Sequence, residues 1–118
     1  MYNALSRYTD EGKVHKSSKY GVDYNKCIIK LEKEANSYGH TIEEMRKMNY
    51  HIDHIIPITM YDLKDNEDVA KCFHPLNLRW LPAEENISKG CRIRPQDLEI
   101  IKTLPKEIYP KYFSINHK

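Results

Sequence analysis

The stretch from residue 50 to residue 90 constrains this chain more than any other part of its sequence. It begins with the adjacent pair Asp53 and His54. The later segment HPLNLRWLP alternates as a strand does, and a proline at each side limits it. Pro82 suits the first position of a short helix, and Gly90 suits the left-handed position just past its end. The stretch therefore predicts a strand or strand-like turn, a connection, a second strand and a helix.

The polar residues of this stretch resemble the HNH endonuclease motif on its ββα-metal finger, in the variant whose last histidine is replaced by asparagine. The resemblance rests on D-H-I-x-P from Asp53 to Pro57, N-L at Asn77, and N-x-x-K from Asn86 to Lys89. The nine-residue step from Asn77 to Asn86 matches the nuclease domain of RNA-guided CRISPR effectors. The short sequences around these residues, HIDHIIP, NL and AEEN with KG, look most like those of the small HNH nucleases of phages and mobile introns. All the parts in order and at their spacing are far more specific than a lone Asp-His pair.

This resemblance implies an α+β fold, a mainly helical small domain around a ββα-metal finger, and metal-dependent cleavage of DNA. Cleavage by water needs a base for the water, positive charge on the phosphate and neutralisation of the leaving 3′ oxygen. His54 is the candidate base, because a neutral imidazole with a pKa near ~6.5 accepts a proton at physiological pH. Asp53 and Asn86 are the candidate ligands of one divalent cation, and their oxygen atoms suit Mg²⁺ or Mn²⁺ better than zinc. For Asn77 the resemblance implies a structural part, in which it holds the loop between the strands so that His54 is aimed correctly.

The adjacency of Asp53 and His54 poses a geometric difficulty. Neighbours in a regular strand point to opposite faces, so the chain must bend or twist for both side chains to address one phosphate. His51 lies two residues before Asp53 and shares its face, where it lines the site or packs behind it. Without Asn77 and Asn86, a surface ion pair at a strand end would explain Asp53 and His54 better. The full pattern favours catalysis.

The distribution of charge says more than the net charge of +2. Residues 51–85 carry a net charge of −4, residues 86–118 carry +4, and the first fifty residues carry +2. A phosphate-binding surface would therefore be built from the two flanks around a metal-binding centre. Lys89 has the best claim as a phosphate contact, because it shares a helix face with Asn86. The four candidate contacts are Arg79, which is as well explained as an exposed side chain, and Lys89, Arg92 and Arg94.

Helical patterns precede the central stretch. Residues 25–38 predict a helix that ends at Gly39, and Thr41 with Glu44 forms a capping box that opens a second short helix. The residues expected to face inward are Ile28, Leu31 and Ala35 in the first helix and Ile42, Met45 and Met48 in the second. Residues 1–25 are polar and rich in tyrosine, and predict a loop-rich start whose tyrosines either stack on bases or, as is more common at this length, pack on a small core.

Two more helices are expected later in the chain. Asp65 can cap a helix that runs to about Phe73 and forms an insertion between the two strands, with Val69 and Cys72 apolar. Pro95 can begin another helix, which Pro105 stops. Its apolar residues at helical spacing are Leu98, Ile101 and Leu104, and Trp80 is expected to fill the core of the finger.

Length and cysteine usage bound the organisation of the chain. At 118 residues and 14.0 kDa it is expected to form one domain, with a helical lead-in (1–49), the finger (50–90) and a C-terminal helix and tail (91–118). Its three cysteines are scattered and form no C-x-x-C pair, so neither a disulfide scaffold nor a structural zinc is expected. A metal site made by Cys72, His74 and Cys91 is conceivable but lacks a convincing fourth ligand. A reducing cytoplasm, that of a bacterial host cell for a phage-encoded protein, is the simplest expectation.

Three function classes remain at this stage. The leading one is an HNH nuclease acting on DNA, most simply double-stranded DNA, as a monomer or weak dimer without a membrane. A nuclease acting on RNA is the same chemistry on another substrate. The second class is a DNA-binding module that has lost catalysis, against which the intact Asp53, His54 and Asn86 argue. The third is a structural metal finger, which would require cysteine pairs that the sequence lacks.

Overall fold

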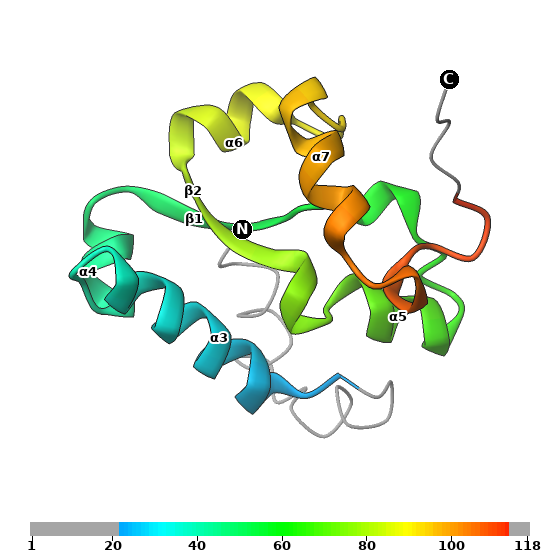
Figure 1. The fold of residues 1–118 in the computed structure, drawn as a ribbon, viewed down its shortest axis with the longest axis horizontal. Coiled ribbons are helices and arrows are strands. Elements are labelled where there is room, and N and C mark those ends of the chain that lie inside the picture. Colours follow the sequence, from blue (N-terminus) through cyan, green and yellow to red (C-terminus); the bar gives the residue numbers. More distant parts are fainter. Residues whose placement is uncertain (1–21, 114–118) are drawn as a thin grey trace.

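The computed structural model describes residues 22–113, so the expectations for residues 1–21, including their tyrosines, lie outside the described residues. In this part of the chain, helices surround a two-stranded antiparallel sheet (Figure 1). The expected α+β class is confirmed. Within residues 22–113 no helix combines the length and the apolar character that crossing a membrane requires.

The order of elements follows the predicted order of two strands and a helix. Helices and strands are α3 (Tyr24–Ser37), α4 (Ile42–Lys47), β1 (Tyr50–His54), α5 (Asn66–Cys72), β2 (Leu78–Pro82), α6 (Ala83–Lys89) and α7 (Pro95–Thr103). Short 3₁₀ turns cover Ile58–Met60, Pro75–Asn77 and Lys106–Ile108. Asn77 therefore ends a 3₁₀ turn immediately before β2. Helix α6 packs on both strands, which completes a ββα unit of residues 50–89.

The register of the sheet separates two kinds of side chain. Asp53 lies opposite Arg79, and His54 lies opposite Leu78. Because strand residues alternate between faces, Ile52 and His54 share one face with Leu78 and Trp80. The other face carries His51, Asp53, Arg79 and Leu81. The first face is mostly apolar, and the second holds the charged residues.

Helix α3 covers the apolar face. Its buried residues are Cys27, Leu31 and Ala35, and the helix packs against β2. Trp80 is buried, and its Nε1 donates a hydrogen bond of 2.9 Å to the Leu31 carbonyl, so its predicted place in the core is confirmed. Ile28, expected inward, is half-buried, whereas the neighbouring Cys27 is fully buried and its Sγ donates a hydrogen bond of 3.1 Å to the Phe73 carbonyl.

The predicted helix ends agree closely with the structure. Thr41 Oγ1 accepts from the Glu44 amide at 3.2 Å, and Glu44 Oε1 accepts from the Thr41 amide at 2.9 Å, which confirms the capping box. Asp65 caps α5, and Pro95 is the first residue of α7. Gly90 follows α6 with a positive φ of 57°. Each of these signals depends on residues within one turn of each other, which is why the sequence shows it.

Two apolar residues expected to face the core do not. Met48 is 43% exposed, because it caps the end of α4 and lies past its last inward-facing turn. Leu98 is 37% exposed on α7, while the neighbouring Asp97 is fully buried. An ionic partner inside the protein, described below, outweighs the apolar character of Leu98 in orienting α7.

Candidate active site

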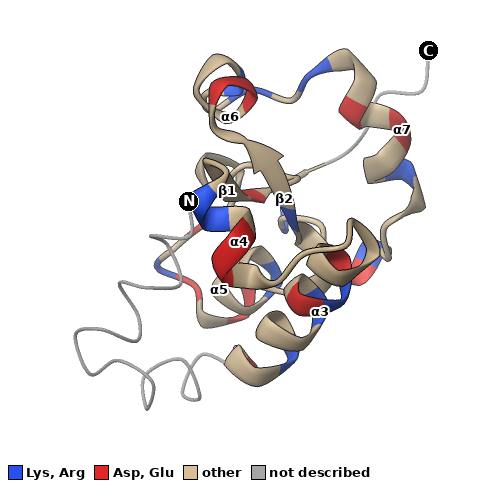
Figure 2. Cartoon of the chain, turned by 90° about the vertical axis from the view of Figure 1, so that its left-hand side faces the viewer, with Lys and Arg blue, Asp and Glu red and all other residues tan. Residues whose placement is uncertain are grey.

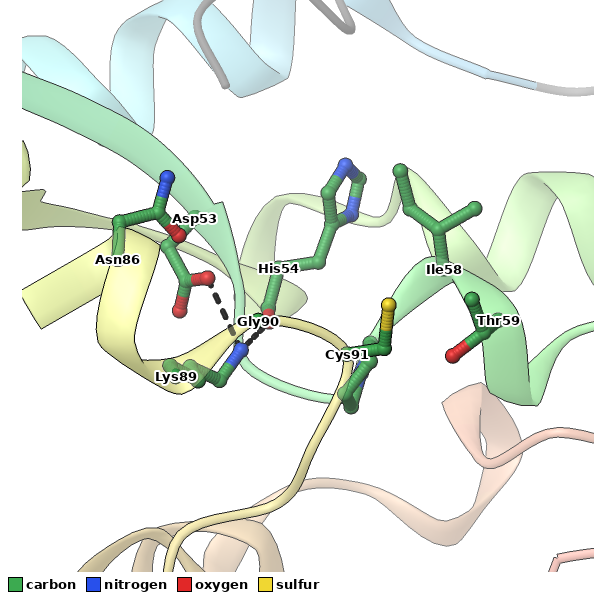
Figure 3. Close-up of a pocket in the computed structure, with 9 residues that line it drawn as sticks. Asp53, His54, Ile58, Thr59, Asn86, Lys89, Gly90 and Cys91 are labelled. Atoms are coloured by element: carbon green, nitrogen blue, oxygen red, sulfur yellow. Dashed lines mark hydrogen bonds and ion pairs between the residues drawn. The ribbon is translucent and has the colours of Figure 1, made fainter.

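A pocket of about 230 Å³ opens where β1 ends and α6 ends. Asp53, His54, Asn86 and Lys89 line it, and Ile58, Thr59 and Cys91 form the other side in Figure 3. The pocket thus brings together three residues predicted as base and ligands, from two elements that are more than thirty positions apart in the sequence. The fourth, Asn77, lies behind it.

Two cations hold the Asp53 carboxylate. Lys89 Nζ donates to Asp53 Oδ1 at 2.9 Å, and Arg79 Nε donates to Oδ2 at 2.9 Å. Asp53 is only 3% exposed, and a buried carboxylate without partners would cost several kcal/mol, on the order of 3–5. Two cations compensate this charge: Arg79, which lies opposite Asp53 in the sheet, and Lys89, which lies in the last turn of α6.

Lys89 reaches from the end of α6 to the strand and is 1% exposed. Besides Asp53 it donates to the carbonyl of His54 at 2.7 Å, as the dashed lines in Figure 3 show. We expected Lys89 as a phosphate contact that shares the helix face of Asn86. The structure instead places its ammonium inside the protein, because an uncompensated Asp53 next to it would be more costly than the loss of water around the lysine.

Arg79 and Arg94 are also engaged inside the protein. Arg79 forms a bidentate pair with Asp97 at 2.9 and 3.0 Å, and Arg94 contacts both Asp97 oxygens at 2.8 and 3.1 Å. Arg94 contacts Glu85 as well, at 3.0 Å. Burial alone would raise the pKa of Asp97, but hydrogen bonds from both arginines hold it well below its usual range. Arg79, expected either as a phosphate contact or as an exposed side chain, and Arg94, expected as a phosphate contact, are thus both already paired with Asp97.

The fourth predicted contact, Arg92, lies on the surface and donates to the carbonyls of Ser88 at 2.7 Å and Lys89 at 3.4 Å. Figure 2 shows both signs of charge on α4 and on α6, with acidic residues at their starts and basic residues at their ends. Acidic side chains at the start of a helix and basic side chains at its end interact favourably with the helix dipole.

The His54 ring is fixed by its surroundings on the apolar side. Its Nδ1 lies 3.0 Å from the Cys72 carbonyl, and the ring packs edge-on against Phe73 with 4.9 Å between centroids. A carbonyl only accepts, so Nδ1 carries the proton and Nε2 the lone pair. Burial lowers the pKa of His54 to about 4, although the Cys72 carbonyl acts in the opposite direction. Nε2 is buried and has no hydrogen-bond partner among the described residues.

Asn77 is fully buried and joins the three segments around His54. Its Oδ1 accepts from the Ile56 amide at 2.8 Å, and its Nδ2 donates to the Ile56 carbonyl at 3.2 Å. Nδ2 also donates at 2.9 Å to the Cys72 carbonyl, the group that holds His54 Nδ1. This is the arrangement that a residue positioning His54 through its loop requires.

Asp53 and His54 point in different directions, as alternation along a strand dictates. Figure 3 shows the carboxylate and the imidazole leaving the chain on different sides. Both nevertheless line the pocket, because it lies at the end of β1, where the strand gives way to the turn at Ile55–Pro57. The chain bends at residues 55–56, directly after the pair, and the site lies beyond the end of the strand.

The donor chemistry of the pocket suits a hard divalent cation. Asn86 Nδ2 lies 3.1 Å from His51 Nδ1, so His51 holds the amide by its nitrogen and leaves the oxygen to the pocket side, near Asp53 in Figure 3. A carboxylate and an amide oxygen, with water for the rest, fit Mg²⁺ or Mn²⁺. Residues 22–113 contain no group of three or more histidine, cysteine, aspartate or glutamate side chains placed to hold a metal. Water would therefore supply most ligands.

Sequence reasoning missed Asp97 and the interior role of Lys89. The only local signal for Asp97 was its spacing of three residues from Arg94 on α7. The link from Arg79 to Asp97 joins residues 18 positions apart, and that from Lys89 to Asp53 joins residues 36 apart. Neither could be derived without the packing of α6 and α7 on the sheet.

No protein-family model matches the chain, and no solved structure matches it. A stretch of 55 residues, 47% of the chain, is 38% identical to "Uncharacterized protein L426" of Acanthamoeba polyphaga mimivirus. The match covers 24% of that protein, so the chain spans about a quarter of the length of this curated relative. The similarity connects about half of the chain to part of a viral protein and assigns no activity.

Proposed function

We propose that this protein is a metal-dependent endonuclease of the HNH type that hydrolyses phosphodiester bonds in DNA. The observation that carries the proposal is the state of His54. Its Nδ1 is held by the Cys72 carbonyl, and its unpartnered Nε2 belongs to a residue that lines the same pocket as Asp53 and Asn86. A buried nitrogen lone pair without a partner is costly, on the order of 1–3 kcal/mol, so it calls for an explanation. Proton abstraction from a water is such an explanation.

In this mechanism His54 Nε2 takes the proton of the attacking water. The Nδ1–H bond to the Cys72 carbonyl then stabilises the imidazolium that forms, and Asn77 keeps that carbonyl in place. Asp53 and Asn86 would hold the divalent cation, which supplies positive charge to the phosphate and acidity to bound water.

The proposed setting is a reducing compartment, the cytoplasm of a host cell. Cys27, Cys72 and Cys91 are all free thiols. Burial raises the pKa of both Cys27 and Cys72 to about 12, which keeps them as unreactive thiols in the core. DNA is the proposed substrate because of the phage-type HNH resemblance, with RNA as the alternative.

One observation favours a second candidate, a DNA-binding module without catalysis. Both oxygens of Asp53 already accept hydrogen bonds from cations. If these pairs persisted in the presence of divalent ions, the pocket would hold no metal. Asp53 would then have only a structural role.

Incubation of the full chain with supercoiled plasmid and Mg²⁺ or Mn²⁺ tests the proposal. One site holds one phosphate, so we expect nicked circles to accumulate before linear product at low enzyme, and chelator to abolish both. A chelator-resistant activity would contradict the metal requirement. Retention of the plasmid on the protein without any cleavage would support the binding module instead. Linear product without a nicked intermediate would indicate two sites acting together.

A further inference from the structure

Lys89 is the largest fully buried side chain among the described residues. Its ammonium lies between Asp53 and the carbonyl of His54, at 2.9 and 2.7 Å. We propose that Lys89 competes with the divalent cation for Asp53, so that the ammonium holds the carboxylate in the ion-free protein and cation binding displaces it. This inference rests on the proposed metal site of Asp53 and Asn86 and concerns how that site is filled.

Charge balance carries the first step. Around Asp53 the ion pairs form one connected chain of alternating sign, whose members are Lys89, Asp53, Arg79, Asp97, Arg94 and Glu85. Its formal charge is zero, with three basic and three acidic groups. A divalent ion added to this chain would leave a charge of +2 beside two side chains, Asp53 and Lys89, that are almost fully buried. The departure of one cation from Asp53 reduces that excess and returns a lone pair of the carboxylate.

The hydrogen bonds indicate which cation leaves. Arg79 is tied to Asp97 by two bonds, and Asp97 is tied in turn to Arg94. Among residues 22–113, the Lys89 ammonium has only the His54 carbonyl as a hydrogen-bond partner besides Asp53. Its four-carbon stem is flexible, whereas the guanidinium fork of Arg79 is planar and fixed by its partners. Lys89 therefore gives up Asp53 at the lower cost.

The pocket offers the displaced ammonium somewhere to go. Lys89 lines it together with Asn86 and His54, and its Cα lies in the last turn of α6, at the pocket wall (Figure 3). Within the pocket the ammonium would meet a bound phosphate. Lys89 would thus be a positioning residue in the ion-free protein and a phosphate contact in the loaded one.

Direct measurement of Mn²⁺ affinity by calorimetry and by paramagnetic resonance tests the competition without reference to activity. Lys89→Met keeps most of the aliphatic volume and removes the charge, and we expect it to bind Mn²⁺ at least about tenfold more tightly, because like charges a few ångströms apart repel strongly in a poorly hydrated site. Asp53→Asn should abolish binding. Lys102→Met is the matched control, since Lys102 pairs with Glu99 at 3.1 Å on the surface, and it should bind as the parent chain does.

The outcomes separate this inference from the proposed function. Equal Asp53-dependent binding by the parent chain and Lys89→Met would overturn the competition and leave the metal site intact. Weaker binding by a folded Lys89→Met protein would overturn it as well, since Lys89 would then support the site. Failure of both proteins to bind Mn²⁺ would overturn the metal site itself and the competition with it.

A measurement on the unmodified chain covers the case in which Lys89→Met does not fold. Acetylation of lysines by a water-soluble reagent, followed by peptide mass analysis, should show Lys89 protected in chelator and reactive with Mn²⁺. Lys102 should react equally in both conditions. Protection of Lys89 that persists at saturating Mn²⁺ would contradict displacement.

Discussion

The two faces of the β1–β2 ribbon position their functional groups by different physics. On the apolar face, His54 is held by a backbone carbonyl, an amide side chain behind it and the edge contact with Phe73. On the charged face, Asp53 is held by two cations that belong to a longer chain of ion pairs. The first arrangement holds His54 without an ion pair, so ions should disturb it less than they disturb the second. The second consists of ion pairs, so a cation that enters the pocket should weaken the contacts of Asp53 with Arg79 and Lys89.

The largest expected effect lies on the apolar face. Replacement of His54 by Ala should lower the cleavage rate by roughly 10²–10⁴-fold, the usual contribution of a positioned base, while DNA binding persists. His40→Ala is the matched control, because the His40 side chain is 37% exposed and its Nδ1 lies 3.7 Å from Glu44 Oε1, away from the pocket. Rates would be measured on supercoiled plasmid with Mg²⁺. Unchanged turnover by a folded His54→Ala protein would remove His54 from the chemistry.

Asn77→Ala should be the most destabilising substitution at the site. It removes three buried hydrogen bonds, and the unsatisfied groups left behind cost about 1–3 kcal/mol each before relaxation, so a loss of about 3 kcal/mol is expected. The rate should fall as well, and excess Mn²⁺ should not restore it. Denaturant unfolding and a metal titration check both expectations. Rescue by Mn²⁺ would mean that Asn77 acts on the ion and not on the loop.

The low pKa of His54 makes stability depend on pH in a defined window. The folded pKa is about 4 and the unfolded one about 6.5, so between these values the unfolded state binds more protons and stability rises with pH. The contribution of His54 to the free energy of unfolding is fully present above about pH 6.5. It is lost as the pH falls toward 4, and the loss is on the order of 3 kcal/mol. In chelator, the free energy of unfolding of the parent chain should fall more steeply with acidity than that of His54→Gln. Parallel curves would show that the folded state does not disfavour the charged ring.

A substitution at Asp97 should weaken the ion pairs of the charged face, because Asp97 holds Arg79 in place beside Asp53. Asp97→Asn weakens the bidentate support of Arg79, and because it leaves two partly buried guanidinium groups without their shared carboxylate we expect a loss of about 1–3 kcal/mol. Glu85→Gln removes an exposed partner of the same chain and should cost at most about 0.5 kcal/mol. Thermal and denaturant unfolding compare the two variants. Equal losses would mean that burial of Asp97 contributes nothing to the network.

The smallest effect on stability is expected at the pocket rim. Asn86 is half-buried, and its side-chain amide contacts His51 at 3.1 Å, so Asn86→Ala should change stability by less than about 1 kcal/mol. It should nevertheless raise the Mg²⁺ concentration needed for half-maximal cleavage, because it deletes a neutral oxygen donor. A large loss of stability with an unchanged metal requirement would show that Asn86 is structural.

Much of this protein follows from local features of its sequence. The capping box at Thr41, the Asp65 cap, Pro95 at the start of α7 and Gly90 after α6 each depend on residues within one turn, where steric and hydrogen-bonding rules act without help from the rest of the chain. The order of strand, strand and helix, and the presence of His54, Asp53 and Asn86 at one pocket, followed from pattern and spacing. A helical period alone did not identify every inward-facing residue. Cys27 is buried in place of Ile28, and Met48 and Leu98 are exposed although they were expected to face the core.

Only the tertiary structure decided how the charged residues are used. Lys89 and Arg79 read as surface cations for phosphate, yet both enclose Asp53, and Asp97 was not recognised at all. The reason is that burial of one charge makes the burial of its partners favourable, and those partners come from positions 18 to 36 residues away. Local propensity contains no information about such pairs, because they exist only once β1, β2, α6 and α7 have been brought together.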